Sequence, residues 1–152
     1  MYYTIGEMAK KMNMSPHTLR FYAKEGLLPF ALRNENGVRL FHEYDYEWFY
    51  VIEILKKTNM PLKDIRQFVE WGMQGDETIE DRRQMFINQI ASVNNQIAEL
   101  EDALEVLRYK QWYYETACAA GTADVPENMS REDIPQHLQH VRDRITGIFQ
   151  NP

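Results

Sequence analysis

The 152-residue sequence contains one cysteine, Cys118, and no long run of apolar residues. A single cysteine excludes a framework of disulfides within the chain and is typical of a reducing cytoplasm. No apolar segment approaches the length of about 20 residues that crosses a bilayer, and the N-terminus shows no secretory pattern. We therefore expect a cytoplasmic protein with no membrane partner.

The signatures of common enzymes are also missing. The sequence has no glycine-rich phosphate loop, no metalloprotease pattern and no hydrolase nucleophile turn. Its acidic residues include no pair that stands out as a general acid and base. The candidate metal ligands, Cys118, His137 and His140, fall short of the fuller set that zinc usually requires. We expect no enzymatic activity, no bound metal and no cofactor.

Basic residues are in the minority, with 17 Lys and Arg against 23 Asp and Glu and a net charge of −6. Such a charge would normally argue against binding to nucleic acid, so its distribution matters. Residues 1–75 hold 10 basic and 9 acidic side chains, whereas residues 76–152 hold 7 and 14. The first half therefore remains free to present a local basic face.

A short helix is predicted between Ser15 and Gly26. Ser15 can cap its first turn, Pro16 suits the first helical position, and Gly26 suits the left-handed residue that ends a helix. Leu19 and Ala23 lie one turn apart on one face. The remaining surface mixes hydrogen-bonding groups, cations and aromatic rings, which favours contact with a nucleic-acid duplex. The candidate DNA contacts on this helix are Ser15, His17, Thr18, Arg20, Phe21, Tyr22 and Lys24.

Another short helix precedes this one and completes a helix-turn-helix pattern. Thr4 and Glu7 have the spacing of a capping box, and apolar residues follow at helical spacing as far as Met12. Asn13 and Met14 then form a tight corner. An ordinary helical hairpin with a solvated polar face is the alternative interpretation.

A β-hairpin is predicted directly after the helix-turn-helix. Asn36-Gly37 is a strong turn signal flanked by short strand-like segments. Arg33 and Arg39 lie on opposite sides of this turn. A ribbon carrying arginines beside a recognition helix would be a wing that contacts the phosphate backbone. A hairpin without such a function is the alternative.

Two further predicted helices supply the apolar residues for a core, which the helix-turn-helix and the hairpin lack. A helix over Tyr44 to Thr58 ends with Lys56 and Lys57, which complement its dipole and could also contact phosphate. Pro61 separates it from a fourth helix that ends near Gly72 and Gly75. The third helix has a predicted buried row of Tyr46, Phe49, Ile52 and Leu55. The fourth is predicted to be amphipathic from the spacing of Leu62, Ile65, Phe68 and Val69.

These features together resemble the MerR family of bacterial transcription regulators over residues 2–75. Phe21 departs from the pattern, because the family usually has tyrosine there; phenylalanine keeps the ring but lacks a hydroxyl that could contact phosphate. The resemblance implies promoter activation by bending and untwisting DNA between the elements that RNA polymerase contacts. It rests on Thr4-Ile5-Gly6-Glu7, Leu19-Arg20-Phe21-Tyr22, Gly26-Leu27-Leu28-Pro29, Asn36-Gly37-Val38-Arg39-Leu40-Phe41 and Asn59-Met60-Pro61-Leu62-Lys63-Asp64-Ile65.

From Ile79 the pattern changes to the apolar heptads of a coiled coil. A helix from Ile79 to Cys118 would be about 60 Å long, too long to bury its stripe within the small domain. A second copy of the chain is the simplest partner. Heptads do not determine strand orientation; the family resemblance implies an antiparallel pair. The predicted dimerisation residues are Phe86, Ile90, Val93, Ile97, Leu100, Leu104 and Leu107.

The last part of the chain is predicted to be a loop after Gly121 and then an amphipathic helix capped by Ser130. About thirty residues cannot form a core alone, so this helix must dock on the coiled coil or on the second copy. Its apolar row is Ile134, Leu138, Val141, Ile145 and Ile148.

Four residues near the end of the long helix form a candidate effector region: Tyr109, Trp112, Tyr113 and Cys118. The aromatic rings could line a ligand pocket or bury the last helix, and we favour burial. Cys118 lies toward a helix C-terminus, where the dipole opposes a thiolate. We therefore expect Cys118 to be a small packing residue, with a thiol sensor as the alternative.

We predict a mainly α protein in three parts. Residues 1–75 form a winged helix-turn-helix domain of four helices and a β-hairpin wing, residues 76–120 a long dimerisation helix, and residues 121–152 a loop and short helix that could respond to an effector. The expected function is DNA-binding transcription regulation by a homodimer on an inverted-repeat operator. The expected partners are double-stranded DNA, RNA polymerase and an unknown small-molecule or stress effector. A coiled-coil adaptor with a protein-binding helix-turn-helix is the alternative.

Overall fold

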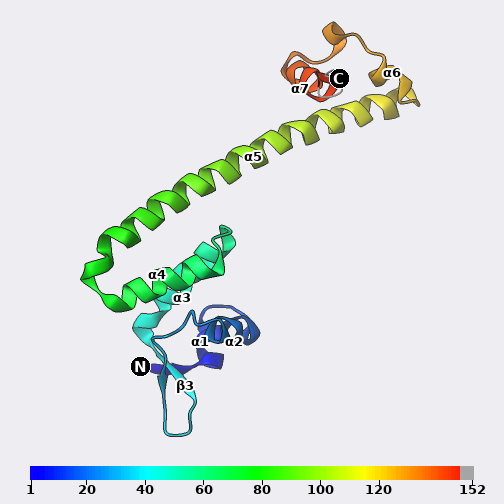
Figure 1. The fold of residues 1–152 in the computed structure, drawn as a ribbon. Coiled ribbons are helices and arrows are strands. Elements are labelled where there is room, and N and C mark those ends of the chain that lie inside the picture. Colours follow the sequence, from blue (N-terminus) through cyan, green and yellow to red (C-terminus); the bar gives the residue numbers. More distant parts are fainter. Residues whose placement is uncertain (148–152) are drawn as a thin grey trace. The chain divides into compact units, whose positions relative to one another are not determined.

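Helices account for most of the computed structural model (Figure 1). It describes residues 1–147, so Ile148, predicted in the last apolar row, lies outside the described residues. The chain divides into two units, Met1–Val93 and Asn94–Pro152. In chain order the elements are β1 (Tyr2–Thr4), α1 (Ile5–Lys11), α2 (Pro16–Lys24), β2 (Leu32–Arg33), β3 (Arg39–His42), α3 (Tyr46–Lys57), α4 (Leu62–Gln74), α5 (Ile79–Ala120), α6 (Asp124–Glu127) and α7 (Gln136–Gly147).

The first unit contains the predicted helix-turn-helix and the predicted wing. The Thr4 hydroxyl accepts from the Glu7 amide at 3.3 Å, and the Glu7 carboxylate accepts from the Thr4 amide at 2.7 Å, which confirms the capping box. Strands β2 and β3 form the hairpin around Gly37, whose φ of +74° requires the left-handed region. Strand β1 was not predicted; it pairs antiparallel with β3, so the sheet order is β1-β3-β2.

One apolar core holds the helices and the sheet of the first unit together. At its centre the Phe49 ring packs edge-on against Phe41 at 5.0 Å and against Phe30 at 5.7 Å between ring centroids. Trp48 lies so close to α4 that a Cβ on Gly72 would come within 2.0 Å of the indole ring. The fully buried members include Met8, Leu19, Tyr22, Leu27, Phe41, Phe49, Ile52, Ile65 and Val69.

The third helix is shorter than predicted, and its first residue is not in the core. A single 3-10 turn, Glu43–Asp45, precedes α3. Phe49, Ile52 and Leu55 are buried as expected, but Tyr46 is 40% exposed, so its prediction as a core residue was wrong. Tyr46 is three residues before Phe49 and four before Tyr50, and in the structure it joins Tyr50 on the outer face.

Helix α5 confirms the predicted long helix and runs two residues beyond Cys118. Its first turns join the core of the first unit, where the rings of Phe86 and Phe68 lie 5.2 Å apart. The Gln89 side-chain amide donates to the Thr58 carbonyl oxygen at 3.0 Å. The heptad residues other than the half-buried Val93 are 37–70% exposed on the single chain. No helix among residues 1–147 is long and apolar enough to cross a membrane.

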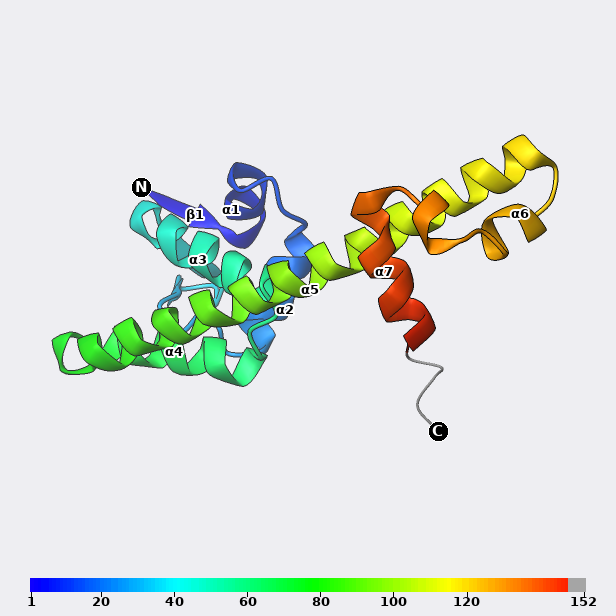
Figure 2. The same cartoon turned by 90° about the horizontal axis from the view of Figure 1, so that it is seen from above.

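The second unit contains α5 from Asn94 onward, the short helix α6 and the helix α7 (Figure 2). Tyr109 of α5 is buried among Ile134, Leu138 and Val141, with Trp112 and Tyr113 packed at the edge. The last helix therefore docks on the long helix of its own chain, and the aromatic residues bury it as favoured from the sequence.

Helix α7 begins later than predicted. Ser130 starts a 3-10 turn, Arg131–Asp133, and not the helix itself. Pro135 forces Ile134 into an extended conformation with ψ of 137°, so the α-helix starts only at Gln136. The segment predicted as a loop also contains the short helix α6.

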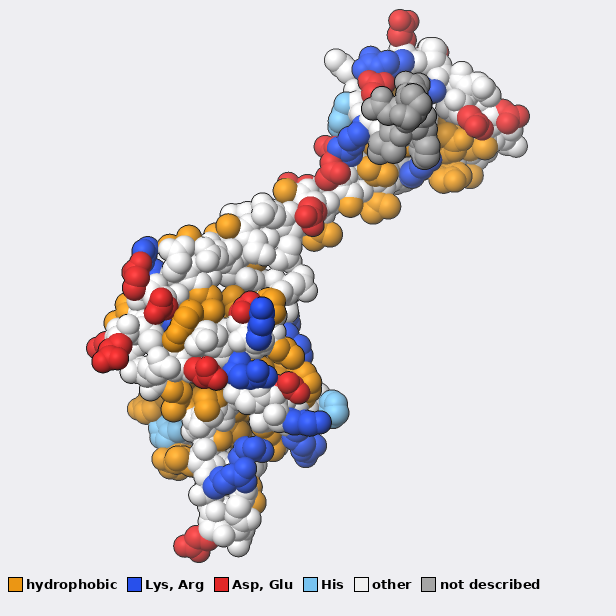
Figure 3. Space-filling model, viewed as in Figure 1, with side chains coloured by type: hydrophobic (Ala, Val, Ile, Leu, Met, Phe, Trp, Pro, Cys, Tyr) orange, Lys and Arg blue, Asp and Glu red, His pale blue; other side chains and the backbone are white. Residues whose placement is uncertain are grey.

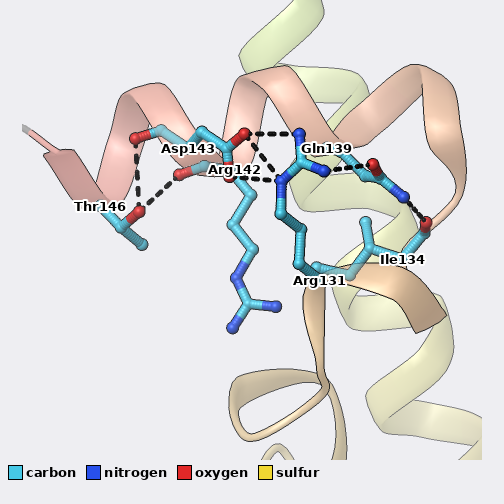
Figure 4. Close-up of polar contacts among 6 residues, drawn as sticks. All are labelled: Arg131, Ile134, Gln139, Arg142, Asp143 and Thr146. Carbon is cyan, nitrogen blue, oxygen red and sulfur yellow. Dashed lines mark hydrogen bonds and ion pairs between the residues drawn. The ribbon is translucent and has the colours of Figure 1, made fainter.

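A polar cluster fastens the turn before α7 to the helix (Figure 4). The Arg131 guanidinium pairs with the Asp143 carboxylate at 2.8 Å and donates to the Gln139 side-chain oxygen at 2.9 Å. The Gln139 amide in turn donates to the Ile134 carbonyl oxygen at 2.9 Å. The turn is thus held to α7 by side chains as well as by the chain itself.

The prediction that Cys118 is a packing residue was wrong, because its side chain is exposed. Ala117 is the buried neighbour, and successive residues on a helix point about 100° apart. Within residues 1–147, no group of three or more His, Cys, Asp or Glu side chains is arranged to hold a metal ion.

Candidate nucleic-acid interface

Helix α2 presents a row of exposed polar side chains. The Ser15 hydroxyl accepts from the His17 amide at 3.2 Å, Pro16 occupies the first turn, and Gly26 has φ of +73°, so both ends form as predicted. Buried Leu19 turns the opposite side toward the core. Thr18 and Phe21 are half-buried beside the exposed row. This outer row consists of His17, Arg20 and Lys24.

Tyr22 points inward, so its predicted place on the outer surface was wrong. Its ring is fully buried, three residues after Leu19 on the same face. Its hydroxyl donates to the Glu53 carboxylate of α3. Burial, and then the nearby Glu53 carboxylate, hold the pKa of the Tyr22 phenol well above its usual range. Tyr22 therefore links α2 to α3 and does not belong to the outer row.

We expect the Tyr22 phenol to make stability fall at alkaline pH. Its folded-state pKa is raised, so its contribution is complete below about pH 10 and is lost as the pH rises further. Between about pH 9 and 11 the wild type should lose more free energy of unfolding than Tyr22→Phe. The two slopes of the free energy of unfolding against pH should differ by a fraction of about 1.4 kcal/mol per pH unit, which is the slope for one bound proton. Urea unfolding across this range measures it, and parallel curves for both proteins would contradict it.

The two lysines predicted as phosphate contacts lie at the end of α3, and Lys56 lies beside α2. The Lys56 ammonium is 4.9 Å from the ring centroids of both Phe21 and Tyr22, a cation–π arrangement. Lys57 pairs with Glu53 at 3.7 Å. Both lysines are exposed, so their charges extend the polar face of α2 onto α3.

Arg66 of α4 is a contributor that sequence reasoning missed. Its guanidinium Nε donates to the Glu25 carbonyl oxygen at 2.8 Å, and Nη2 lies 3.7 Å from the Glu25 carboxylate. A cation at the end of a helix satisfies its last carbonyls and favours its dipole. Arg66 thereby holds the end of α2 from 41 residues away, a separation at which no local pattern could indicate the pairing.

The wing places its two arginines opposite one another in the β2–β3 ladder. The Arg33 guanidinium donates to the Gly37 carbonyl oxygen at 2.9 Å, and the Asn34 side-chain oxygen accepts from the Val38 amide at 2.9 Å. Like charges directly opposite in a ladder destabilise it. The Arg33–Arg39 pair thus creates a site where an anion would be favourable.

Basic side chains gather over the α2 side and the wing of the first unit (Figure 3). Elsewhere on this unit Lys11 pairs with Glu43 at 3.2 Å. The acidic net charge of the whole chain therefore coexists with a local basic face on the first unit.

The comparisons with known proteins agree with this geometry. Residues 3–70 match the MerR HTH family regulatory protein model, and residues 48–109 match the MerR, DNA binding model. An uncharacterized HTH-type transcriptional regulator from Haemophilus influenzae is 47% identical over 122 residues, which cover 80% of this chain and 90% of that protein. The chain belongs to the MerR family. This is a family of transcription regulators and not of enzymes.

Solved MerR structures show the same architecture. HiNmlR, a MerR family regulator lacking the sensor domain and bound to promoter DNA, is 46% identical with a TM-score of 0.73, covering 82% of this chain and 98% of that one. A MerR family regulator from Bacillus thuringiensis is 41% identical with a TM-score of 0.67, covering 72% and 96%. The predicted fold, a winged helix-turn-helix followed by a long helix, is thus confirmed.

Proposed function

We propose that this MerR regulator binds an inverted-repeat promoter operator as a homodimer. Each copy places α2 in a major groove and the wing along the adjacent backbone. The observation that carries the proposal is the outer row of His17, Arg20 and Lys24, which nothing in the fold requires, on the scaffold that HiNmlR uses while bound to promoter DNA. Arg33 and Arg39 of the wing, with Lys56 and Lys57 of α3, supply phosphate contacts.

The proposed dimer forms along α5. The heptad side chains share one stripe and are largely exposed on the single chain, which supports burial against an identical stripe. An antiparallel pair related by a two-fold axis would give two equivalent reading heads. The two-fold axis of the protein then requires a two-fold axis in the operator.

The proposed regulation acts through the shape of the promoter. A rigid pair of α5 helices sets the separation of the two reading heads, and binding bends and untwists the DNA between the elements that RNA polymerase contacts. RNA polymerase is thus a partner at the promoter. Deforming DNA costs free energy that the backbone contacts of both copies offset.

The proposal is tested by sequencing the DNA that the purified protein retains from fragmented genomic DNA. We expect enrichment of an inverted repeat, and a binding constant for that duplex that falls steeply with salt, because phosphate contacts release counterions. An adaptor that uses its helix-turn-helix for protein contacts would retain no enriched sequence and show no such salt dependence.

We propose that the second unit responds to the effector. Trp112 and Tyr113 pack at the edge of its small core and are only half-buried, so a flat or cationic molecule could insert beside them. The Lys110 ammonium lies 4.9 Å from the Tyr113 ring centroid, which shows that this ring already accepts a cation. Rearrangement here would act directly on the end of α5.

We expect Cys118→Ser to retain both DNA binding and the response to the inducer. Cys118 is exposed, but the chain has no second cysteine to resolve an oxidised thiol. Transcription from the cognate promoter, with and without an oxidant or an aldehyde, measures the response. A wild-type response that disappears in Cys118→Ser would make the thiol the sensor.

A further inference from the structure

Helix α3 carries a polar stripe that the core does not explain. Tyr46, Tyr50, Glu53 and Lys57 follow one another at spacings of four, three and four residues, and therefore lie along one face. Tyr46 is 40% exposed and Tyr50 is 55% exposed. Neither tyrosine belongs to the core cluster of the first unit, so core packing does not account for their place on α3.

The stripe forms one side of an open hollow of about 430 Å³ beside the recognition helix. Ser15 and Thr18, at the start of α2, line the other side, and the corner residues Met12, Asn13 and Met14 lie at its end. We call this the tyrosine hollow. It presents hydroxyl groups from both helices and one ammonium group, that of Lys57.

The groups in the tyrosine hollow favour an anion. Glu53 is the acidic member of its lining, and its carboxylate is already engaged by the Tyr22 hydroxyl and by Lys57. Within residues 1–147, the hydroxyls of Tyr46 and Tyr50 make no hydrogen bond to the chain, so both remain free to donate. Neutral donors beside a cation match the oxygens of a phosphodiester, which accept but do not donate.

We propose that the tyrosine hollow holds a backbone phosphate of the same duplex that α2 enters. The Tyr46 and Tyr50 hydroxyls donate to the phosphate oxygens, and the Lys57 ammonium supplies charge. This inference rests on the proposed DNA-binding function and adds two tyrosines to it. Because Ser15 and Thr18 line the hollow at the start of α2, we expect it to contact the backbone that flanks the groove. Its contribution is therefore independent of base sequence.

The test measures the affinity of the full-length chain for its selected operator duplex and for a scrambled duplex of the same length. Tyr50→Phe keeps the ring and should weaken both by the same factor, about three- to tenfold, without changing the salt slope. Tyr46→Phe combined with Tyr50→Phe should weaken both further, and Lys57→Gln should lower the slope by about two, one for each copy. Tyr114→Phe, an exposed tyrosine of the second unit, is the matched control and should change nothing.

A single neutral methylphosphonate in the operator identifies the contact directly. Scanned along each half-site, it should weaken wild-type binding most at one phosphate and have a smaller effect there on the double tyrosine variant, in which only Lys57 still contacts that phosphate. Additive losses at every phosphate, or unchanged affinity of the double variant, would overturn the proposal. Arg20→Ala distinguishes the proposed phosphate contact from the proposed function. If it weakens operator binding while the tyrosine variants do not, the phosphate contact is wrong and the proposed function stands. Equal, salt-insensitive binding of all variants would overturn both.

Discussion

Leu100→Glu is expected to abolish the homodimer, and operator binding with it. Leu100 is 70% exposed on the single chain and lies in the middle of the heptad stripe of α5. In the dimer its side chain would be buried, and the two-fold axis would bury two carboxylates in one interface. Each unpaired buried carboxylate costs several kcal/mol, more than a single apolar contact contributes.

Sedimentation velocity at micromolar concentration measures this change, with circular dichroism to confirm that the helices persist. Ala98→Glu is the matched control, since it adds the same charge to an exposed position of α5 two residues away and off the heptad stripe. We expect Ala98→Glu to remain dimeric. A monomeric wild type, or a dimeric Leu100→Glu, would contradict the proposed assembly.

Arg20→Ala is expected to give the largest loss of DNA affinity among single changes on α2. Arg20 is exposed, and within residues 1–147 it makes no hydrogen bond or ion pair, so its removal should leave stability nearly unchanged. A contact to a base edge is worth about 1–3 kcal/mol. The dimer carries two copies, and distant sites add, so the complex should lose about 2–6 kcal/mol.

Fluorescence anisotropy with the selected operator measures this loss, and a mutated operator distinguishes the kind of contact. If Arg20 reads a base, the variant should bind wild-type and mutated operators more equally. If it contacts phosphate, binding should weaken uniformly and the salt slope should fall by about two, one for each copy in the dimer. Arg108→Ala, an exposed arginine of the second unit, is the control. An unchanged affinity in folded Arg20→Ala would exclude α2 as the reading helix.

Much of the architecture could be predicted from the sequence because its signals are local. The capping box of Thr4 and Glu7, the Ser15-Pro16 start of α2 and the Asn36-Gly37 turn each involve residues within one or two turns of the chain. The heptad pattern predicted the long helix α5 for the same reason, because a repeat of seven residues can be read along one continuous segment. Local hydrogen bonding and periodicity therefore determined the elements and their order.

Only the tertiary structure decided which side chains of different elements contact one another. Tyr22 turns inward to Glu53, Arg66 holds the end of α2, and β1 pairs with β3, all across separations of more than thirty residues. Tyr46 was predicted in the core because it is three residues before the buried Phe49, but it is also four residues before the exposed Tyr50. Only the packing of α3 against its neighbours decides which of these two faces Tyr46 joins. Such pairings depend on which surfaces meet when the chain folds, and no pattern along a single segment contains that information.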